Sequence, residues 1–91
     1  MPKDLAEALR WARLAAQQGN VRAYLSLAGM YEKGEGIPQD NVQAYMWYDV
    51  AQLRGNESAA RYRDKVARRM TQDQKAEAQR LVREWMARHN Q

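Results

Sequence analysis

Apolar side chains recur along the chain every three or four residues, which is typical of helices with one buried face. This spacing predicts helices over about residues 3–18, 21–33, 41–54, 57–70 and 71–88. No segment alternates between apolar and polar residues in the manner of a β-strand. The pattern therefore predicts an all-α domain of about five helices with short connections.

Each predicted helix carries a set of residues that we expect to face the core. Trp11 stands at the edge of the first stripe, and we interpret it as a core residue because its position recurs at Trp47. In chain order, the inward sets are Leu5, Ala8, Leu9, Ala12, Ala15 and Ala16; Ala23, Leu27 and Tyr31; Ala44, Trp47, Tyr48 and Ala51; Ala59, Tyr62, Val66, Ala67 and Met70; and Ala78, Leu81, Val82, Trp85 and Met86.

The chain repeats itself with a period of 36 residues. The matching positions are structurally special residues rather than common ones, and they pair Pro2 with Pro38, Asp4 with Asp40, Ala8 with Ala44, Trp11 with Trp47, Ala15 with Ala51, Gly19 with Gly55, Asn20 with Asn56 and Ala23 with Ala59. A period of this length is that of a helix-turn-helix unit in a helical solenoid. We therefore expect antiparallel helix pairs stacked into an α/α superhelix.

The ends of the predicted helices carry residues suited to capping. Asp4 and Asp40 are expected to be N-caps, each with Glu or Gln three residues later, and Thr71 has Gln74 at the same spacing. Gly19 and Gly55 stand where helices end, and the asparagine after each glycine is expected to cap the next helix. The glycines and proline of Gly34–Pro38 predict a turn.

Composition limits the remaining possibilities. Ninety-one residues suit a single small domain, and the absence of cysteine excludes disulfides and thiolate metal sites. The N-terminal segment resembles neither a signal peptide nor a membrane span, so we expect a cytoplasmic protein and no membrane contact. The net charge of +4 is uneven, because residues 61–91 hold 9 Lys and Arg against 4 Asp and Glu. This surplus suits either an acidic partner or simply a solvated helix face.

The run from Ala23 to Asn56 resembles the Sel-one-like repeat, a relative of the tetratricopeptide repeat. The positions that carry the resemblance are Ala23, Leu27, Tyr31, Gly34, Gly36, Ile37, Asp40, Ala44, Trp47, Tyr48, Ala51, Gly55 and Asn56. It implies one domain over 1–91, with a half repeat at 2–20, a full repeat at 21–55, a terminal helix at 56–70 and a capping helix at 71–88. The terminal helix departs from the family pattern by carrying Arg63 and Asp64 in place of apolar and small residues.

The resemblance implies a scaffold or adaptor that binds a peptide or protein on the concave side of the solenoid. On this chain that side corresponds to the second and fourth helices. The residues expected to contact a partner are Arg22, Leu25, Ser26 and Lys33 on the second helix and Arg61, Lys65 and Arg68 on the fourth. Leu25 stands out because an apolar residue on a solvent face can anchor a ligand, although single exposed leucines are also common.

The first helix lacks the partner helix that would precede it in a repeat. Its outer face combines Glu7, Arg10, Arg13 and Gln17 with the apolar Leu14. That face is either polar enough to remain in water, or it docks on another copy of the chain, and we predict a homodimer through this helix.

The alternative function is the binding of nucleic acid or another polyanion. Arg61, Lys65 and Arg68 lie at i, i+4 and i+7 and form one basic stripe, but acids such as Asp64 and Glu84 interrupt the surplus and no nucleic-acid-binding motif is present. An enzyme, a metal site and a cofactor site find no support. His89 is the only histidine, and Ser26 and Ser58 have no histidine placed to activate them.

Overall fold

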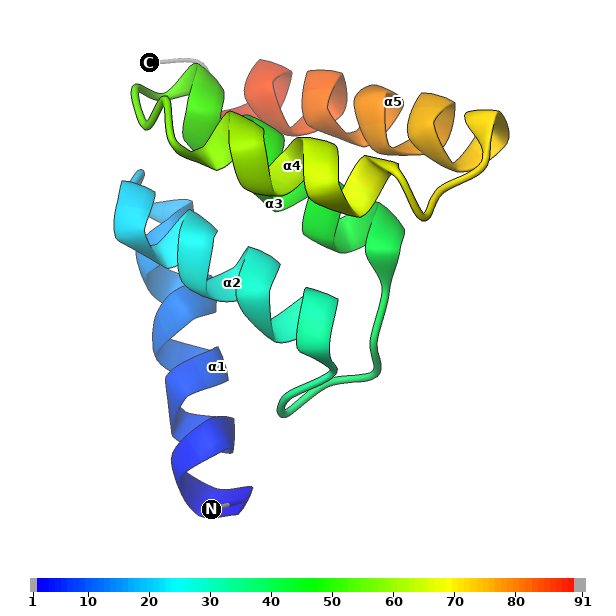
Figure 1. The fold of residues 1–91 in the computed structure, drawn as a ribbon. Helices are drawn as coiled ribbons and strands as arrows, with labels where there is room; N and C mark the ends of the chain where they lie inside the picture. The colour runs from blue at the N-terminus through cyan, green and yellow to red at the C-terminus, as the bar shows by residue number, and fades with distance from the viewer. Residues whose placement is uncertain (1, 90–91) are drawn as a thin grey trace.

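Five α-helices make up the regular secondary structure of residues 2–89, the part of the chain that the computed structural model describes (Figure 1). They are α1 (Pro2–Gln17), α2 (Val21–Lys33), α3 (Asn41–Leu53), α4 (Ala59–Ala67) and α5 (Gln72–Arg88). The predicted all-α class and the five predicted helices are confirmed. The largest difference in length is at α4, which was expected over 57–70.

The helix α4 is short because the chain forms tight turns on either side of it. Before the helix, the side chain of Asn56 accepts a hydrogen bond from the backbone N–H of Ala59 at 3.2 Å, as predicted for a capping residue. After the helix, the N–H groups of Arg69 and Met70 donate to carbonyls three residues back rather than four. Such bonds tighten and end a helix.

The predicted capping residues of α2 and α3 are confirmed. The Oδ1 atom of Asn20 accepts from the N–H of Ala23 at 3.3 Å, and that of Asp40 accepts from the N–H of Gln43 at 3.1 Å. Both caps have extended backbone, as residues preceding a helix do. The side chains of Asn20 and Asp40 therefore accept hydrogen bonds from backbone N–H groups that have no acceptor within their own helices.

The capping box of α5 is complete, whereas the predicted cap of α1 is wrong. Thr71 Oγ1 accepts from the N–H of Gln74 at 3.1 Å, and Gln74 Oε1 accepts in return from the N–H of Thr71 at 2.9 Å. Asp4 lies inside the first turn of α1, because the helix already begins at Pro2. Proline suits the first turn since its fixed φ is helical and its missing N–H is not needed there.

Two glycines shape the connection between α2 and α3. Gly34 ends α2 with φ +72°, and its N–H donates to the carbonyl of Met30 at 2.8 Å. Gly36 has φ +82°, and a Cβ atom there would lie only 3.4 Å from Leu5 Cβ on α1. The predicted turn at Gly34–Pro38 is thus confirmed, and the positive φ of Gly34 and Gly36 explains why glycine is favoured at both positions.

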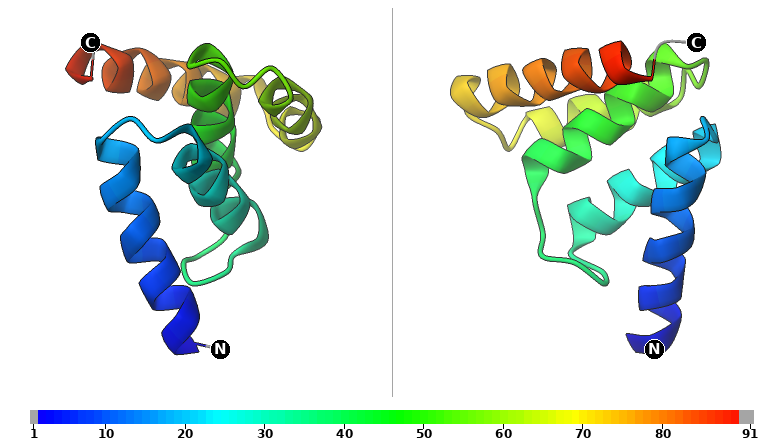
Figure 2. Two further views of the ribbon diagram at one scale, coloured as in Figure 1. Left: turned by 90° about the vertical axis from the view of Figure 1, so that its left-hand side faces the viewer. Right: turned by 180° about the vertical axis from the view of Figure 1, so that it is seen from behind.

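The helices are arranged around α3, which contacts α2, α4 and α5 (Figures 1 and 2). α4 lies on the side of α3 that faces the viewer in Figure 1, α5 crosses α3 on the opposite side, and α2 lies below α3. α1 packs against α2 at the N-terminal end. The chain is therefore a short helical solenoid whose final helix covers the central one.

Three aromatic rings from three helices join α2, α3 and α5. The ring of Trp85 meets those of Tyr24 and Trp47 edge to face, with centroids 5.3 and 5.6 Å apart, and Tyr24 and Trp47 stack at 5.9 Å. These separations are within the range for favourable aromatic pairs. Tyr24 is fully buried and Trp85 nearly so. We call these three residues the aromatic cluster.

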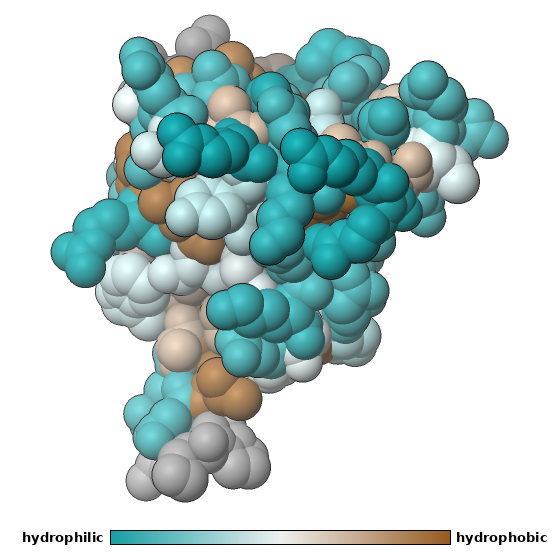
Figure 3. All heavy atoms as spheres, in the orientation of Figure 1, coloured by the Kyte–Doolittle hydropathy of each residue, from teal (hydrophilic) through white to brown (hydrophobic). Residues whose placement is uncertain are grey.

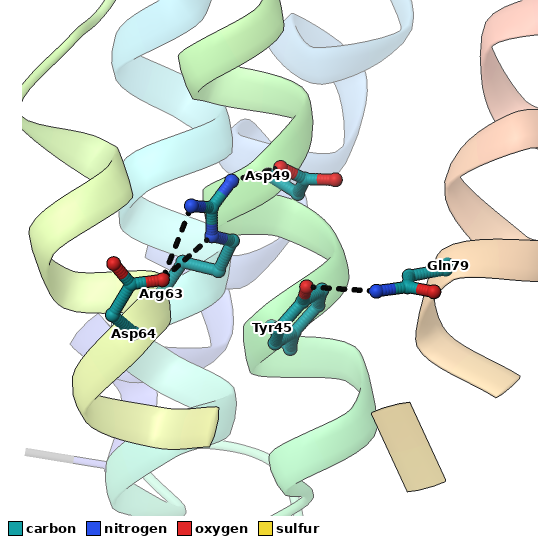
Figure 4. A network of polar contacts seen from close by, with 5 residues as sticks. All are labelled: Tyr45, Asp49, Arg63, Asp64 and Gln79. Carbon is teal, nitrogen blue, oxygen red and sulfur yellow. Dashed lines mark hydrogen bonds and ion pairs between the residues drawn. The ribbon is translucent and has the colours of Figure 1, made fainter. Parts of the chain in front are cut away.

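A polar network fastens α3 to its other neighbours (Figure 4). Arg63 on α4 donates to Asp49 on α3 at 2.7 Å and to its neighbour Asp64 at 3.1 Å. On the far side of α3, the side chain of Gln79 on α5 donates to the Tyr45 hydroxyl at 3.3 Å. Arg63 and Asp64 stand where the repeat pattern has apolar and small residues. At this position α4 is therefore held to α3 by the ion pair of Arg63 with Asp49.

Two aromatic residues predicted to face the core are instead half-exposed. Tyr62 on α4 is 52% exposed and stacks on Tyr48 at 5.6 Å, since α4 is covered on one side only. Trp11 is 50% exposed although it matches Trp47 in the repeat. Its neighbour Leu14 is 58% exposed, whereas the matching residue Val50 is fully buried. The equivalent face of α3 is covered by α5, and no described helix covers this face of α1.

Replacing Trp85 by alanine is expected to lower the free energy of unfolding by about 3–5 kcal/mol, because the change removes a buried aromatic side chain from contact with three helices. Urea denaturation followed by circular dichroism at 222 nm measures this loss. Trp11→Ala is the matched control, and its cost should stay below about 1 kcal/mol because Trp11 is half in water. Equal losses for the two variants would contradict the arrangement described here.

Candidate protein-interaction surface

One exposed stripe runs along α2. Arg22, Ser26 and Lys33 are exposed, and with Gly29 they follow the spacing i, i+4, i+7 and i+11 that aligns side chains on one helix face. No atom lies within 4 Å of a Cβ atom built on Gly29, so space is open above the backbone there. Three predicted contact residues therefore share one exposed helix face, and the glycine between them leaves open space above the backbone.

Leu25 does not belong to this exposed stripe. It is half-buried and packs against both hydrophobic clusters of the core. The buried surface of α2 is wider than predicted, since Tyr24, Ala28 and Met30 are buried in addition to Ala23 and Leu27. A helix with neighbours on two sides needs a broad apolar face. The prediction that Leu25 is an outward-facing anchor is thus corrected.

A second exposed stripe runs along α4 and the residue after it. Arg61, Lys65 and Arg68 are all exposed, and none of them forms an ion pair within the described part of the chain. The nearby Arg63 and Arg69 do form ion pairs. Figure 3 shows hydrophilic residues gathered over α4 on this face. The stripe thus consists of cations that form no ion pair among the described residues, with the exposed Asp64 on the same helix.

Glu32 links α2 to α3 and to the segment after α4. Its Oε1 atom accepts a hydrogen bond from the Tyr48 hydroxyl at 2.8 Å, and its Oε2 atom pairs with Arg69 Nη2 at 3.0 Å. Burial, and then the hydrogen bond with Glu32, raise the pKa of Tyr48 well above the usual tyrosine value, so the hydroxyl stays a donor. Glu32 therefore holds the end of α2 beside α3 and the segment that follows α4.

Sequence reasoning did not find Glu32. Its ion-pair partner lies 37 residues away, and neither residue belongs to the repeat pattern. Only the spatial approach of α2 to the end of α4 brings them together. The predicted partner-binding residues lie on α2 and on α4, with Arg68 directly after α4, and α2 and α4 both pack against α3.

Among the described residues, no group of three His, Cys, Asp or Glu side chains is placed to hold a metal ion. The ring of His89 stacks on Trp85 at 4.0 Å. None of the helices in residues 2–89 combines the length and the apolar character that crossing a membrane requires.

Comparisons with known proteins agree with the helical-repeat architecture. A family model described as Sel1 repeat matches residues 1–20 and 21–56. Chitin synthase regulatory factor 3 of Schizosaccharomyces pombe (strain 972 / ATCC 24843) is 38% identical over 55 residues, which are 60% of this chain and 6% of that protein. Chitin synthase regulator SKT5 of Saccharomyces cerevisiae (strain ATCC 204508 / S288c) is 40% identical over 55 residues, which are 60% of this chain and 8% of that protein. This chain therefore matches only a small part of each fungal regulator.

Replacing Leu25 by glutamate is expected to destabilise the fold by about 2–3 kcal/mol, because the change places a carboxylate against both apolar clusters. Ser26→Glu introduces the same group one residue later on the exposed stripe and should change stability by less than about 0.5 kcal/mol. Thermal unfolding of the two variants and the wild type provides the comparison. If the Leu25→Glu variant were as stable as the Ser26→Glu variant, the result would contradict the burial of Leu25.

Proposed function

Because the chain belongs to the Sel1 repeat family, we propose that it is a non-catalytic scaffold that binds a peptide or protein across α2 and α4. The observation that carries the proposal is the pair of exposed stripes on these adjacent helices. One contains Arg22, Ser26 and Lys33, and the other contains Arg61, Lys65 and Arg68. Sel1 repeats generally serve protein–protein interaction, and the surface provides space and unpaired charge for a partner.

The charge of the surface favours a partner with acidic residues. Five of the six stripe residues are cations, and those on α4 have no ion-pair partner among residues 2–89. Complementary charge speeds association and selects the partner more than it adds affinity. We therefore infer an acidic peptide or protein segment lying along the two helices.

The names of the relatives are consistent with a role in regulation without catalysis. Both fungal proteins are named as regulators of chitin synthase. The match spans less than a tenth of either protein, so their target is not carried over to this chain. What carries over to the proposal is the general role of a helical repeat that acts by binding.

Nucleic acid is the second candidate for the basic stripe. The side chains of Arg61, Lys65 and Arg68 are exposed together, which suits phosphate contacts. Against this, Asp64 lies on the same helix with 62% of its side chain exposed. A gel shift with duplex and single-stranded oligonucleotides at 50 and 200 mM salt separates the candidates. Binding that is strong at low salt and lost at 200 mM salt would favour nucleic acid.

The proposed partner interaction predicts that charge reversal on α4 weakens binding. Arg61→Glu and Lys65→Glu, each made singly, should lower the affinity for a partner isolated from the native source at least about threefold at physiological salt, with a smaller loss at high salt. Arg83→Glu is the matched control, since Arg83 is exposed on α5 and lies outside both stripes. Equal weakening by all three variants would indicate non-specific charge attraction and contradict the proposed surface.

We also propose that α1 pairs with α1 of a second copy. Trp11 and Leu14 are half-exposed or more on this helix. The acids Asp4 and Glu7 lie in its first half, and Arg10 and Arg13 lie in its second half. An antiparallel, two-fold arrangement would therefore place the acids of one copy opposite the arginines of the other. The same contact would cover the apolar side chains.

Light scattering over a concentration series tests the homodimer. The mass is expected to rise from that of one 10.6 kDa chain toward twice that value as the concentration reaches high micromolar. Leu14→Glu should keep the chain monomeric, because it places a charge in the apolar contact. Leu53→Glu is the control, since Leu53 is 51% exposed on α3. A wild-type chain that stays monomeric at every concentration removes the proposed dimer.

A further inference from the structure

A cleft opens between the C-terminal ends of α1 and α5, away from the surface formed by α2 and α4. It has two lobes of about 420 and 320 Å³, which share Gln17, Trp85, Arg88 and His89 as lining residues. Figure 2 shows the end of α5 lying over the end of α1. We propose that this cleft binds a peptide carboxylate that is carried next to an aromatic side chain.

The floor of the cleft is aromatic. Tyr24 and Trp85 line the larger lobe, and Trp47 lines the smaller lobe together with Leu27. These are the rings of the aromatic cluster, so their positions are fixed by mutual packing. Tyr24 is fully buried and Trp85 nearly so, and Trp47 is the partly exposed ring of the three. A ligand ring would contact Trp47 at low entropic cost, because that side chain is already ordered.

The rim of the cleft is cationic. Arg54 and Arg88 line the larger lobe, and Arg13 and Arg88 line the smaller lobe. None of the residues that line either lobe in the described structure is acidic. Arginine is suited to carboxylates because its planar donors match two oxygens at once. The combination of floor and rim selects a ligand that is both aromatic and anionic.

Two buried polar atoms beside the larger lobe lack a partner. The Tyr24 hydroxyl and the Nε atom of Arg54 make no hydrogen bond. Within residues 2–89, they are the buried side-chain nitrogen and oxygen atoms that lack a hydrogen-bond partner. Tyr24 is fully buried, and Arg54 donates through Nη2 to the carbonyl of His89 at 2.6 Å. A buried donor without an acceptor is unfavourable, so a ligand oxygen that accepts from either atom has a favourable position.

His89 contacts two of the residues that line the larger lobe. Its ring stacks on Trp85 at 4.0 Å, and its carbonyl accepts the hydrogen bond from Arg54. It is the C-cap of α5, and helix ends fray most readily. A carboxylate would replace the His89 carbonyl as acceptor for Arg54 when this capping residue moves aside.

Neutralisation of helix ends is the competing explanation for the arginines. α1, α3 and α5 end at Gln17, Leu53 and Arg88, so their carbonyl-rich ends converge near the cleft, and cations are favourable there. This accounts for the sign of the charge. It does not account for the unpaired donors of Tyr24 and Arg54, nor for the cleft beside the aromatic cluster. A ligand explains all three observations.

The test titrates the full chain with three capped dipeptides and follows the indole N–H signals by ¹H–¹⁵N NMR. The probes are N-acetyl-Gly-Phe with a free carboxylate, its C-terminal amide, and N-acetyl-Asp-Phe-amide. The Trp47 and Trp85 signals are expected to shift saturably with a carboxylate probe, at a millimolar dissociation constant, while Trp11 outside the cleft stays unchanged. Binding of the first probe identifies a C-terminal carboxylate as the ligand, and binding of the third identifies a side-chain carboxylate.

Three variants separate binding from folding. Arg88→Gln is expected to weaken the carboxylate probes at least threefold, and Arg83→Gln, an exposed residue of the same helix, to leave them unchanged. Tyr24→Phe should also weaken binding while leaving thermal stability equal or higher, because it removes only the unpaired hydroxyl. Equal shifts with the neutral amide, no saturable shift with either carboxylate, or no effect of Arg88→Gln would overturn the proposal.

Discussion

The structure depends on the burial of α3 by helices on opposite sides. A single helical hairpin cannot enclose its own apolar face, so each repeat needs a neighbour. Here α4 and α5 flank α3 and α2 packs below it, which leaves Ala44, Val50 and Ala51 without any exposed surface. α5 is held there by the aromatic cluster and by its own capping box. A chain of only 91 residues thereby buries the apolar core positions of its central helix.

Features set by neighbouring residues in the chain could be predicted from the sequence. The caps at Asn20, Asp40 and Thr71 and the turn at Gly34–Pro38 are local, because the residues that interact lie three or four positions apart. Even here the prediction failed at Asp4. The repeat suggested that α1 would start as α3 does, but α1 starts earlier, at Pro2.

Features set by distant residues could not be predicted. Trp11 and Trp47 are the same residue at the same repeat position, yet only Trp47 packs in the aromatic cluster, since α5 covers α3 and not α1. Leu25 was misplaced for a similar reason, because its burial depends on both clusters. The candidate surface was located from the family pattern, while its link through Glu32 and Arg69 needed the folded chain.

The position of α1 at the edge of the stack has a consequence for dynamics. α1 packs mainly against α2, and the described residues provide no further helix on its outer side. In solenoids each unit is stabilised by its neighbours, so an end unit with one neighbour opens at a lower free energy than the rest. Backbone amides of α1 should thus exchange with solvent through local opening, while those of α3 exchange only when the whole chain unfolds. The first helix is in effect a separately melting segment whose order depends on what covers it.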